Sequence, residues 1–405
     1  MSKAIRLSVL PALDSLEKLA EVLHRLAWYC APFSGAGLKV SVPVTQSLLE
    51  APRLKEKVLA NCPEPFHPCC IDTLNANWEI FDFVADQDGR LEEAAVIICV
   101  DHSAAELVLK RYPALELAVK RKEVHKVIID TEANVFEAAE LPETFAKVFP
   151  AKREEGVSRV YFSHFIKKLQ EQGIEASLLL APGHSCETID LSKFHNTTLV
   201  VPNTLIGQEH ILNHVGPVVA VIGDPYFCGV SRYGGNYRRV LADFLSRENR
   251  LFVTQIQYLR YFLQDTPKNL HQKMVGVPTR FEGFPPARVN LDLTREFVCV
   301  DAWNVTTSVA FPVACSLGRM LLLAGLDGRE KGASAMWASH RAAEHDTIGR
   351  SHGGLVQADN EEYYARHEAS LAVYIAQAEL DGKRPLSLTP SLYRSVMEKY
   401  QSKSS

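Results

Sequence analysis

Residues 301–327 read DAWNVTTSVAFPVACSLGRMLLLAGLD, and this stretch carries the strongest indication of the fold. Polar residues begin an apolar helix, the strand MLLL follows at residues 320–323, and the chain then turns at Gly325 and Asp327. In an α/β sheet the N-terminus of a helix presents backbone N–H groups to an anion, and polar residues just beyond a strand face the binding crevice. The stretch therefore predicts two walls of a nucleotide or phosphate pocket. The polar helix start consists of Asn304, Thr306, Thr307 and Ser308.

On both sides of this stretch, short apolar runs alternate with segments whose apolar residues recur every three or four positions, as in a helix. This alternation is typical of parallel sheets, and the continuous apolar runs of the second half suit a sheet that is covered on both faces. We therefore predict an α/β protein with two Rossmann-like domains, of which the C-terminal one is doubly wound around a mostly parallel sheet. The expected strands are residues 5–10, 38–42, 96–100 and 126–129, and then 177–180, 198–201, 218–222, 251–255, 298–300 and 320–323.

The domain boundary is expected near residue 150. At 405 residues the chain is too long for one ordinary core. Residues 142–155 are charged and carry prolines, and a new α/β series begins after them. The sequence thus predicts an N-terminal α/β domain over residues 1–150, whose role it does not indicate, and a second domain over residues 151–405.

Composition places the chain among soluble folded proteins. Apolar residues make up 47% and charged residues 23%, and the formal net charge of -4 gives no electrostatic reason to expect a nucleic-acid partner. The nine cysteines are an odd number without C-x-x-C spacing, which favours reduced thiols in the cytosol and no metal site. No apolar run reaches the ~18 residues of a membrane span. We expect a cytoplasmic protein and leave attachment to the inner membrane surface open.

Residues 328–360 contain few large apolar side chains, which is unusual for a connection inside a compact domain. Two interpretations remain open. The segment is either a lid whose basic side chains approach a phosphate on closure, or a solvated surface loop. Its basic side chains are Arg329, Lys331, His340, Arg341, His345, Arg350 and His352.

Four polar segments each follow an apolar run, so a parallel sheet would bring them to one edge. They are residues 181–185 (APGHS), 202–204 (PNT), 223–226 (GDPY) and the stretch from residue 306 to residue 327. Gly183 permits close approach of backbone to a ligand. Ser185 either caps a helix or holds a phosphate oxygen.

These segments, in this order, resemble the bacterial sialyltransferases that decorate lipooligosaccharide, whose scaffold is shared by motility-accessory and pterin-pyrophosphokinase-like proteins. The resemblance runs from about residue 177 to the C-terminus. It rests on LAPGHSCETID at 180–190, Asn203, Asp224, NVTTSV at 304–309 and LAGLD at 323–327. In the family the first motif reads G-N-G-P-S, the helix start T-S-G and the strand end G-I-D. Pro182 and His184 depart from the first motif, which puts the donor's identity in doubt.

The resemblance implies that residues 151–405 form a sialyltransferase-like domain that binds a CMP-sugar. The implied activity is transfer of a sialic-acid-like or other ulosonic sugar from the CMP donor to a glycan or lipid-linked glycan, without a separate cofactor or metal. By position, the resemblance implies that Gly183 and Ser185 lie near the nucleotide phosphate, and that Asn203 and Asp224 lie near the donor or acceptor sugar. It implies that Thr306, Thr307 and Ser308 face the phosphate or the sugar carboxylate. Gly325 and Asp327 would lie beside the ribose and base.

The resemblance also implies a catalytic base, His367, on the last long helix before the ending LTPS at residues 388–391. Helical spacing places His367 on one stripe with Tyr364, Leu371, Tyr374 and Ala378, so we expect it to face inward. An imidazole with a pKa near ~6.5 can accept a proton from an acceptor hydroxyl. The alternative is a buried histidine satisfied by one hydrogen bond.

Asp224 is a second candidate catalytic residue, as nucleophile in a retaining reaction, although the residues themselves favour a helix-capping role. The aromatic and arginine residues after it, among them Tyr226 and Arg238, suit a sugar or carboxylate site. A leaving cytidylate needs fixed donors, for which Tyr363, Tyr364, Tyr226 and the basic side chains of 328–360 are candidates, with rim packing as the alternative for the tyrosines.

Two other functions remain open. Pterin-type diphosphate transfer on the same scaffold would require a nucleoside triphosphate and magnesium. A non-catalytic protein that binds nucleotide or glycan would account for the altered first motif.

Overall fold

The computed structural model describes residues 5–64, 66–85, 91–100, 103, 106, 109–129, 135–302, 304–328 and 361–400, without the side chains of 92, 135–139, 204 and 361–363. The chain divides into two compact units. Unit 1 comprises Met1–Pro150 and Pro225–Asn236, and unit 2 comprises Ala151–Asp224 and Tyr237–Ser405. The segment Pro225–Asn236 thus belongs to unit 1, although its neighbours in the chain belong to unit 2. Nothing in the sequence indicated this exchange.

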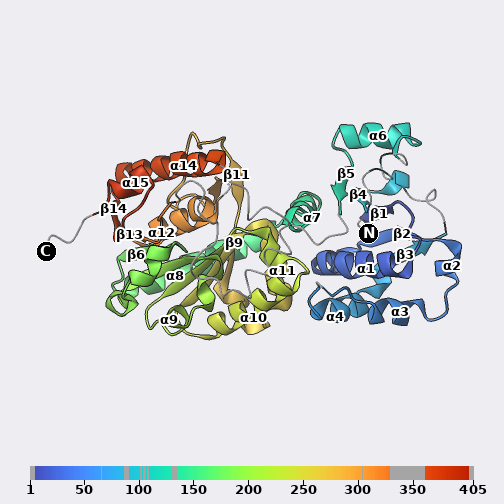
Figure 1. Cartoon of the computed structure of the whole chain (residues 1–405), viewed down its shortest axis with the longest axis horizontal. Helices are drawn as coiled ribbons and strands as arrows, with labels where there is room; N and C mark the ends of the chain where they lie inside the picture. Colours follow the sequence, from blue (N-terminus) through green and yellow to red (C-terminus); the bar gives the residue numbers. More distant parts are fainter. Residues whose placement is uncertain are drawn as a thin grey trace. The chain divides into compact units, whose positions relative to one another are not determined.

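Unit 1 is built on a five-stranded parallel sheet with the order β3-β2-β1-β4-β5. Ser15 caps the long helix α1, which is buried along most of its length. Figure 1 labels the elements. The strands are β1 (Arg6–Leu10), β2 (Lys39–Pro43), β3 (Phe81–Val84), β4 (Val96–Cys99) and β5 (His125–Ile128). The helices are α1 (Leu16–Cys30), α2 (Gln46–Leu49), α3 (Leu54–Ala60), α4 (Cys69–Ala76), α6 (Pro113–Lys120) and α7 (Val135–Val148).

Unit 2 is built on a seven-stranded parallel sheet with the order β10-β9-β8-β7-β6-β13-β14. The predicted α/β class with parallel sheets is therefore confirmed in both units. The strands are β6 (Ala176–Leu180), β7 (Thr197–Pro202), β8 (Val218–Ile222), β9 (Arg250–Gln255), β10 (Met274–Val277), β13 (Met320–Ala324) and β14 (Arg384–Ser387). The helices are α8 (Lys152–Glu171), α9 (Glu209–Leu212), α10 (Arg232–Ser246), α11 (Ile256–Asp265), α12 (Phe311–Leu317), α14 (Glu361–Leu380) and α15 (Arg394–Met397), and α10 begins within unit 1.

One predicted strand lies outside the main sheet. β12 (Cys299–Asp301) pairs only with β11 (Thr279–Phe281), and these two form a separate parallel ribbon. A short apolar run at 298–300 indicated a strand but not its partner. The prediction that this strand belongs to the large sheet is therefore wrong.

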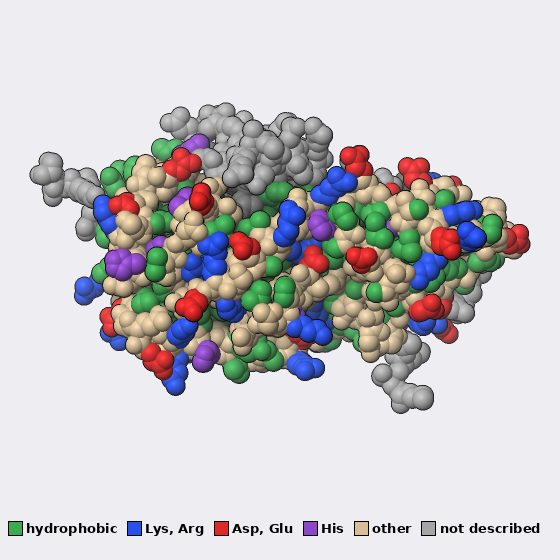
Figure 2. All heavy atoms as spheres, turned by 90° about the horizontal axis from the view of Figure 1, so that it is seen from below, with side chains coloured by type: hydrophobic (Ala, Val, Ile, Leu, Met, Phe, Trp, Pro, Cys, Tyr) green, Lys and Arg blue, Asp and Glu red, His purple; other side chains and the backbone are tan. Residues whose placement is uncertain are grey.

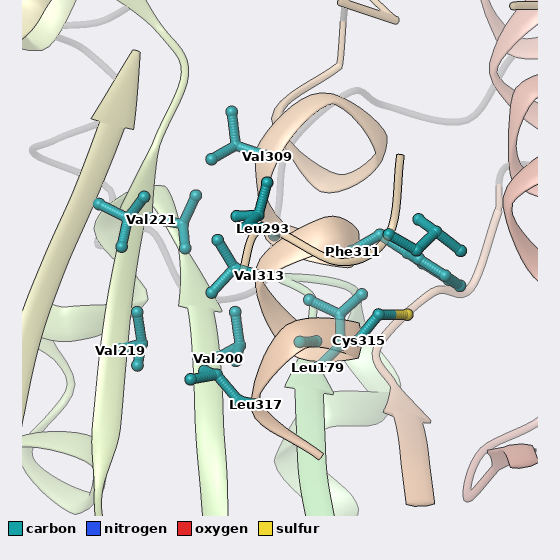
Figure 3. Close-up of a cluster of buried hydrophobic side chains, with 14 of the residues drawn as sticks. Leu179, Val200, Val219, Val221, Leu293, Val309, Phe311, Val313, Cys315 and Leu317 are labelled. Carbon is teal, nitrogen blue, oxygen red and sulfur yellow. The ribbon is translucent and has the colours of Figure 1, made fainter. Parts of the chain in front are cut away.

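The burial of the strands in the core of unit 2 explains why continuous apolar runs predicted them correctly. β7, β8 and β9 are buried at every position, as expected for strands covered on both faces. Figure 3 shows α12 laying Val313 and Leu317 against this sheet, beside Val200 and Val219. Full burial of such a side chain contributes about 1.5–3 kcal/mol to the free energy of folding.

The surface charges of the face in Figure 2 are intermixed, and the cysteines form no disulfide bonds. On the face drawn in Figure 2, acidic and basic side chains are intermixed rather than gathered into fields of one sign. All nine cysteines lie within the described residues and are thiols, and most of them are buried. Over the described part of the chain, no helix has both the length and the apolar character that crossing a membrane requires.

Candidate functional site

The strand order of unit 2 reverses between β6 and β13. From β6 the chain steps outward through β7, β8, β9 and β10, and it then returns to place β13 on the other side of β6. In open α/β sheets, ligands bind in the crevice beyond the carboxyl ends of the two strands at such a switch point. Leu180 and Ala324 are partners in register there, so the segments that follow them meet at one place. These are the predicted segments 181–185 and 325–327.

The two segments approach each other so closely that only glycine fits. The N–H of Gly183 donates to the carbonyl of Gly325 at 2.9 Å. A Cβ on Gly325, whose φ is 72°, would lie 1.9 Å from the carbonyl oxygen of Ala181. A Cβ on Gly183 would lie 2.4 Å from the oxygen of Gly325. The glycines predicted at these positions are thus explained by strand-end packing.

Asp327 and Ser185 are joined by a double hydrogen bond across the crevice. The backbone N–H of Ser185 donates to Asp327 Oδ2 at 2.8 Å, and the Ser185 hydroxyl donates to Oδ1. Both donors of Ser185 therefore serve a carboxylate, whose negative charge would repel a phosphate in the same place. This geometry does not favour the predicted phosphate contact of Ser185. It favours a ligand group that donates hydrogen bonds to Asp327, such as a sugar hydroxyl or an amino group.

The LTPS ending forms a third side of the crevice, which the sequence indicated only as a motif. It follows β14, and its backbone continues the pairing with the end of β13. The N–H of Leu392 donates to the carbonyl of Asp327 at 2.7 Å, and the Ser391 hydroxyl donates to the carbonyl of Leu326. Thr389 Oγ1 accepts from the N–H of Gly325 at 3.3 Å. Ser391 and Thr389 therefore hold the turn that carries Asp327.

His367 lies on α14 with its ring against Tyr393, at a centroid distance of 5.3 Å. The predicted inward stripe is confirmed, because His367, Leu371 and Tyr374 are all buried. Burial lowers the pKa of His367 to about 4, since the charged imidazolium loses its hydration. The ordinary pKa near 6.5 that we expected is therefore wrong. Nδ1 has no hydrogen-bond partner among the described residues.

The predicted polar helix start is turned inward. It forms a π-helical turn, Thr306–Ala310, ahead of α12, and its hydroxyl groups are buried. Ser308 Oγ accepts from the N–H of Ala302 at 2.7 Å and donates to Asp301 Oδ1 at 3.2 Å. Asn304 Oδ1 accepts from the N–H of Thr306, and the Thr307 hydroxyl donates to the carbonyl of Asn304. Local capping thus uses the hydroxyls of Thr307 and Ser308, which does not favour their predicted contact with an anion. The predicted anion contact of Thr306 stays a prediction.

Asn203 and Asp224 follow β7 and β8 at the same edge of the sheet. They stand one and two strands from β6 on the side away from β13, which places Asp224 on the order of 10 Å from the end of β6. Asn203 has a φ of 53°, a conformation that asparagine tolerates better than most residues. Its Oδ1 is buried and has no hydrogen-bond partner among the described residues.

The aromatic residues after Asp224 do not line a sugar site. Tyr226, Phe227 and Tyr233 are buried in unit 1, where Tyr233 lies 5.4 Å from each of the other two rings. Arg238 is buried in unit 2 and forms an ion pair with Asp265 at 2.9 Å. Because these side chains are buried and contact one another or Asp265, the structure does not favour the sugar or carboxylate site that their density predicted. Tyr226 is accordingly withdrawn as a phosphate donor.

Several predicted donors cannot be placed. The side chain of Tyr363 and residues 329–360, which include the basic side chains of the proposed lid, lie outside the described residues. Tyr364 is half-buried near the start of α14. Of the predicted site residues, the structure brings Gly183, Ser185, Gly325 and Asp327 into direct contact.

His367 joins this group indirectly, through Tyr393. The N–H of Tyr393 donates to Ser391 Oγ at 3.0 Å, and Ser391 in turn bonds the turn that carries Asp327.

When the chain is compared with protein-family models, with curated proteins and with solved structures, nothing matches.

Proposed function

We propose that the protein is a glycosyltransferase that moves a sialic-acid-like or other ulosonic sugar from a CMP donor to a glycan or lipid-linked glycan. The donor nucleotide lies in the crevice between β6 and β13. One observation carries the proposal, namely the meeting of Gly183, Ser185, Gly325 and Asp327 at the topological switch point. Two motifs of the sialyltransferase resemblance, LAPGHSCETID and LAGLD, meet there.

The chemistry of the crevice supports the ribose and base end of a nucleotide better than its phosphate. Gly183 and Gly325 let the two backbone segments close against each other, which fixes the turn that carries Asp327. Each carboxylate oxygen of Asp327 retains acceptor capacity beyond its bond to Ser185. Ribose hydroxyls and the cytosine amino group are donors of the matching kind.

The departing cytidylate gains negative charge in an oxocarbenium-like transition state, so it needs fixed hydrogen-bond donors. In this proposal Tyr363, Tyr364 and the basic side chains between Arg329 and His352 supply them. The sugar extends along the sheet edge toward Asn203 and Asp224. The buried, unpartnered Oδ1 of Asn203 is an acceptor that a sugar hydroxyl would satisfy.

The acceptor hydroxyl must lose a proton during the transfer, and His367 is the proposed base. His367 is neutral at pH 7, as a base must be, but a pKa of about 4 makes it a poor acceptor in the ground state. Its role requires charge to develop on the acceptor hydroxyl before the proton moves. Asp224 is the alternative, as nucleophile of a retaining reaction.

Binding of CMP, followed as a rise in the melting temperature, tests the proposal. A ligand at 100 times its Kd stabilises the native state by about 2.7 kcal/mol. Asp327→Asn should abolish most of the CMP-induced rise. Asp190→Asn is the matched control, because Asp190 also accepts from the N–H and hydroxyl of a serine, Ser192, but at an exposed site. The control should respond to CMP as the native chain does.

The same screen separates the alternatives. A rise with ATP and magnesium but not with CMP would replace the proposal by pterin-type diphosphate transfer. A rise with CMP, without release of CMP from a CMP-sugar in the presence of glycans, would leave a binding protein. Equal CMP responses of Asp327→Asn and Asp190→Asn would remove the crevice as the site.

A further inference from the structure

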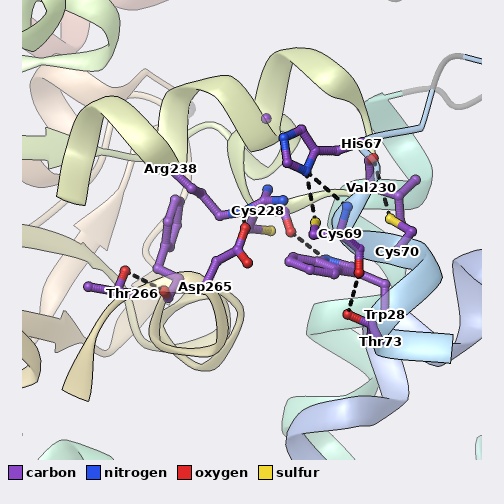
Figure 4. A network of polar contacts seen from close by, with 12 residues as sticks. Trp28, His67, Cys69, Cys70, Thr73, Cys228, Val230, Arg238, Asp265 and Thr266 are labelled. Atoms are coloured by element: carbon purple, nitrogen blue, oxygen red, sulfur yellow. Dashed lines mark hydrogen bonds and ion pairs between the residues drawn. The ribbon is translucent and has the colours of Figure 1, made fainter. Parts of the chain in front are cut away.

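Unit 1 holds a thiol and an imidazole in direct contact. His67 and Cys69 belong to the stretch HPCC at residues 67–70, and Cys69 is the first residue of α4. His67 Nδ1 lies 2.9 Å from Cys69 Sγ, and both residues are half-buried (Figure 4). The adjacent Cys70 is fully buried and directs its sulfur toward the carbonyl of Val230, so the two cysteines differ in character.

The surrounding hydrogen bonds show which of the two atoms, His67 Nδ1 or Cys69 Sγ, is the donor. The backbone N–H of Cys69 donates to His67 Nδ1 at 3.3 Å. A nitrogen that accepts from a backbone N–H carries no hydrogen of its own, so the neutral ring is protonated at Nε2. Nδ1 is therefore an acceptor, and the thiol of Cys69 donates to it. This is the arrangement of a thiol with its general base.

The imidazole is held in place by the segment Pro225–Asn236. The backbone N–H of His67 donates to the carbonyl of Val230 at 2.8 Å, and Phe66 forms a β-bridge with Ser231. A Cβ on Gly235 would lie 2.3 Å from atoms of the His67 ring, so the ring occupies space that only glycine leaves. The same segment is tied to α1, where the indole N–H of Trp28 donates to the carbonyl of Cys228 at 2.9 Å.

A second thiol and one cation lie within electrostatic range. Burial raises the pKa of the Cys62 thiol, the charge of Cys69 raises it further, and Arg232 lowers it. When Cys69 carries a negative charge, Cys62 therefore stays protonated. The first turn of α4 adds partial positive charge beside the Cys69 sulfur. Of the two half-buried thiols, Cys69 is thus the one equipped to ionise and attack.

We propose that Cys69, with His67 as its base, is a thiol–disulfide exchange site for small disulfides. The thiol proton moves to His67 Nδ1, and the sulfur attacks one sulfur of the disulfide. A bond forms between Cys69 Sγ and that sulfur, while the disulfide bond of the reagent breaks. The leaving thiolate takes the proton from His67 and departs as a thiol. One disulfide is consumed and one mixed disulfide is formed, so no other oxidant is needed.

Stopped-flow reaction of the full-length chain with an aromatic disulfide, whose released thiol ionises in solution to a thiolate that absorbs visible light, tests the proposal. The native chain should show one fast thiol. Cys69→Ser should lose this phase, whereas Cys62→Ser, which alters the other half-buried thiol, should keep it. His67→Phe should slow the phase about a hundredfold at pH 6.5, the lower end of general base effects. The slowing should be smaller at pH 8.5, because hydroxide then removes the proton.

Three results would overturn the proposal. The fast phase could persist in Cys69→Ser, or Cys62 could react as fast as Cys69. The third is equal slowing of His67→Phe at both pH values, which would mean that the ring acts only by packing. A measurement on the native chain avoids any folding defect of the variants. Limiting iodoacetamide at neutral pH, followed by peptide mass spectrometry, should label Cys69 before Cys62, and the reverse order would also refute the assignment.

Discussion

The crevice between β6 and β13 and the His67–Cys69 pair both depend on glycine, but glycine has a different function in each. At the crevice, Gly183 and Gly325 let two backbone segments touch, and the polar groups that meet there bond to one another. In unit 1, Gly235 leaves room for a side chain, and that side chain faces a nucleophile. The histidines differ accordingly. His367 is buried with a lowered pKa, whereas His67 is half-buried and hydrogen-bonded to a thiol.

This contrast separates two uses of a histidine that sequence patterns cannot distinguish. His367 stood on an apolar helical stripe, and that position predicted burial correctly. Burial alone makes an imidazole a weaker base, because it removes the solvent that stabilises the protonated form. A base needs a partner whose proton it accepts, and His67 acquires that partner through the turn into α4.

The largest effect is expected at the crevice. Gly325→Ala should lower the free energy of unfolding by about 3 kcal/mol or more, because the new Cβ would meet the carbonyl of Ala181 at 1.9 Å. Gly173→Ala is the matched control within unit 2, since its φ of 69° is similar but nothing lies within 4 Å of its Cβ. It should cost only about 1–2 kcal/mol of backbone strain. Urea unfolding measures both, and equal losses would show that the close approach is not tight.

The next effect concerns His367 and pH. Its pKa is about 4 in the folded chain and near 6.5 when unfolded, so the unfolded chain binds more protons between these values. Stability should therefore fall as pH drops from 6.5 toward 4, by about 3 kcal/mol from this group alone. Above pH 6.5 both states are neutral, and the contribution of His367 no longer changes.

Replacing His367 by leucine should remove close to one proton from the uptake on unfolding near pH 5, measured from the pH dependence of urea midpoints. A residual slope should remain from His214, whose pKa is also lowered to about 4, first by burial and then by Arg250. If His367→Leu had the same slope as the native chain, His367 would be accessible to protons when folded. The contrast with His67 would then disappear.

The smallest effect separates packing from chemistry in unit 1. Gly235→Ala should displace the His67 ring and slow the reaction of Cys69 with the aromatic disulfide about tenfold, equivalent to about 1.4 kcal/mol. Gly156→Ala is the control, because this glycine lies within α8 and has nothing within 4 Å of its Cβ. It should leave the thiol rate unchanged and raise the free energy of unfolding by about 0.5–1 kcal/mol. Comparable thiol rates in the two variants would argue against Gly235 as the support of His67.

Most of the strands that were predicted are buried along nearly their whole length, although β5 is a half-buried edge strand. Residues 198–201 and 218–222 are continuous apolar runs, and they became the interior strands β7 and β8. The strands that were missed lie at sheet edges. β14 carries Pro385 and β3 carries Asp82, and an edge strand that is partly exposed needs no continuous apolar run.

The candidate site was predicted in the same uneven way. Gly183, Gly325 and Asp327 were indicated by their positions after strands, since parallel strands bring their ends to one edge. The bond between Ser185 and Asp327 was not, because it joins residues from segments that are far apart in the chain. The inward turn of Thr307 and Ser308 was also missed, because local capping competed with the exposed arrangement that we expected.

The amino-acid sequence by itself determined the α/β class and which segments end at the sheet edge, because hydrophobic periodicity and chain order are local properties. Only the tertiary structure decided the strand order, the transfer of Pro225–Asn236 to unit 1 and the partners of each polar group. It also decided the pKa of His367 and the contact between His67 and Cys69. The reason is that the strength of a base or a nucleophile depends on its solvent exposure and on the atoms within a few ångströms of it, and folding sets both.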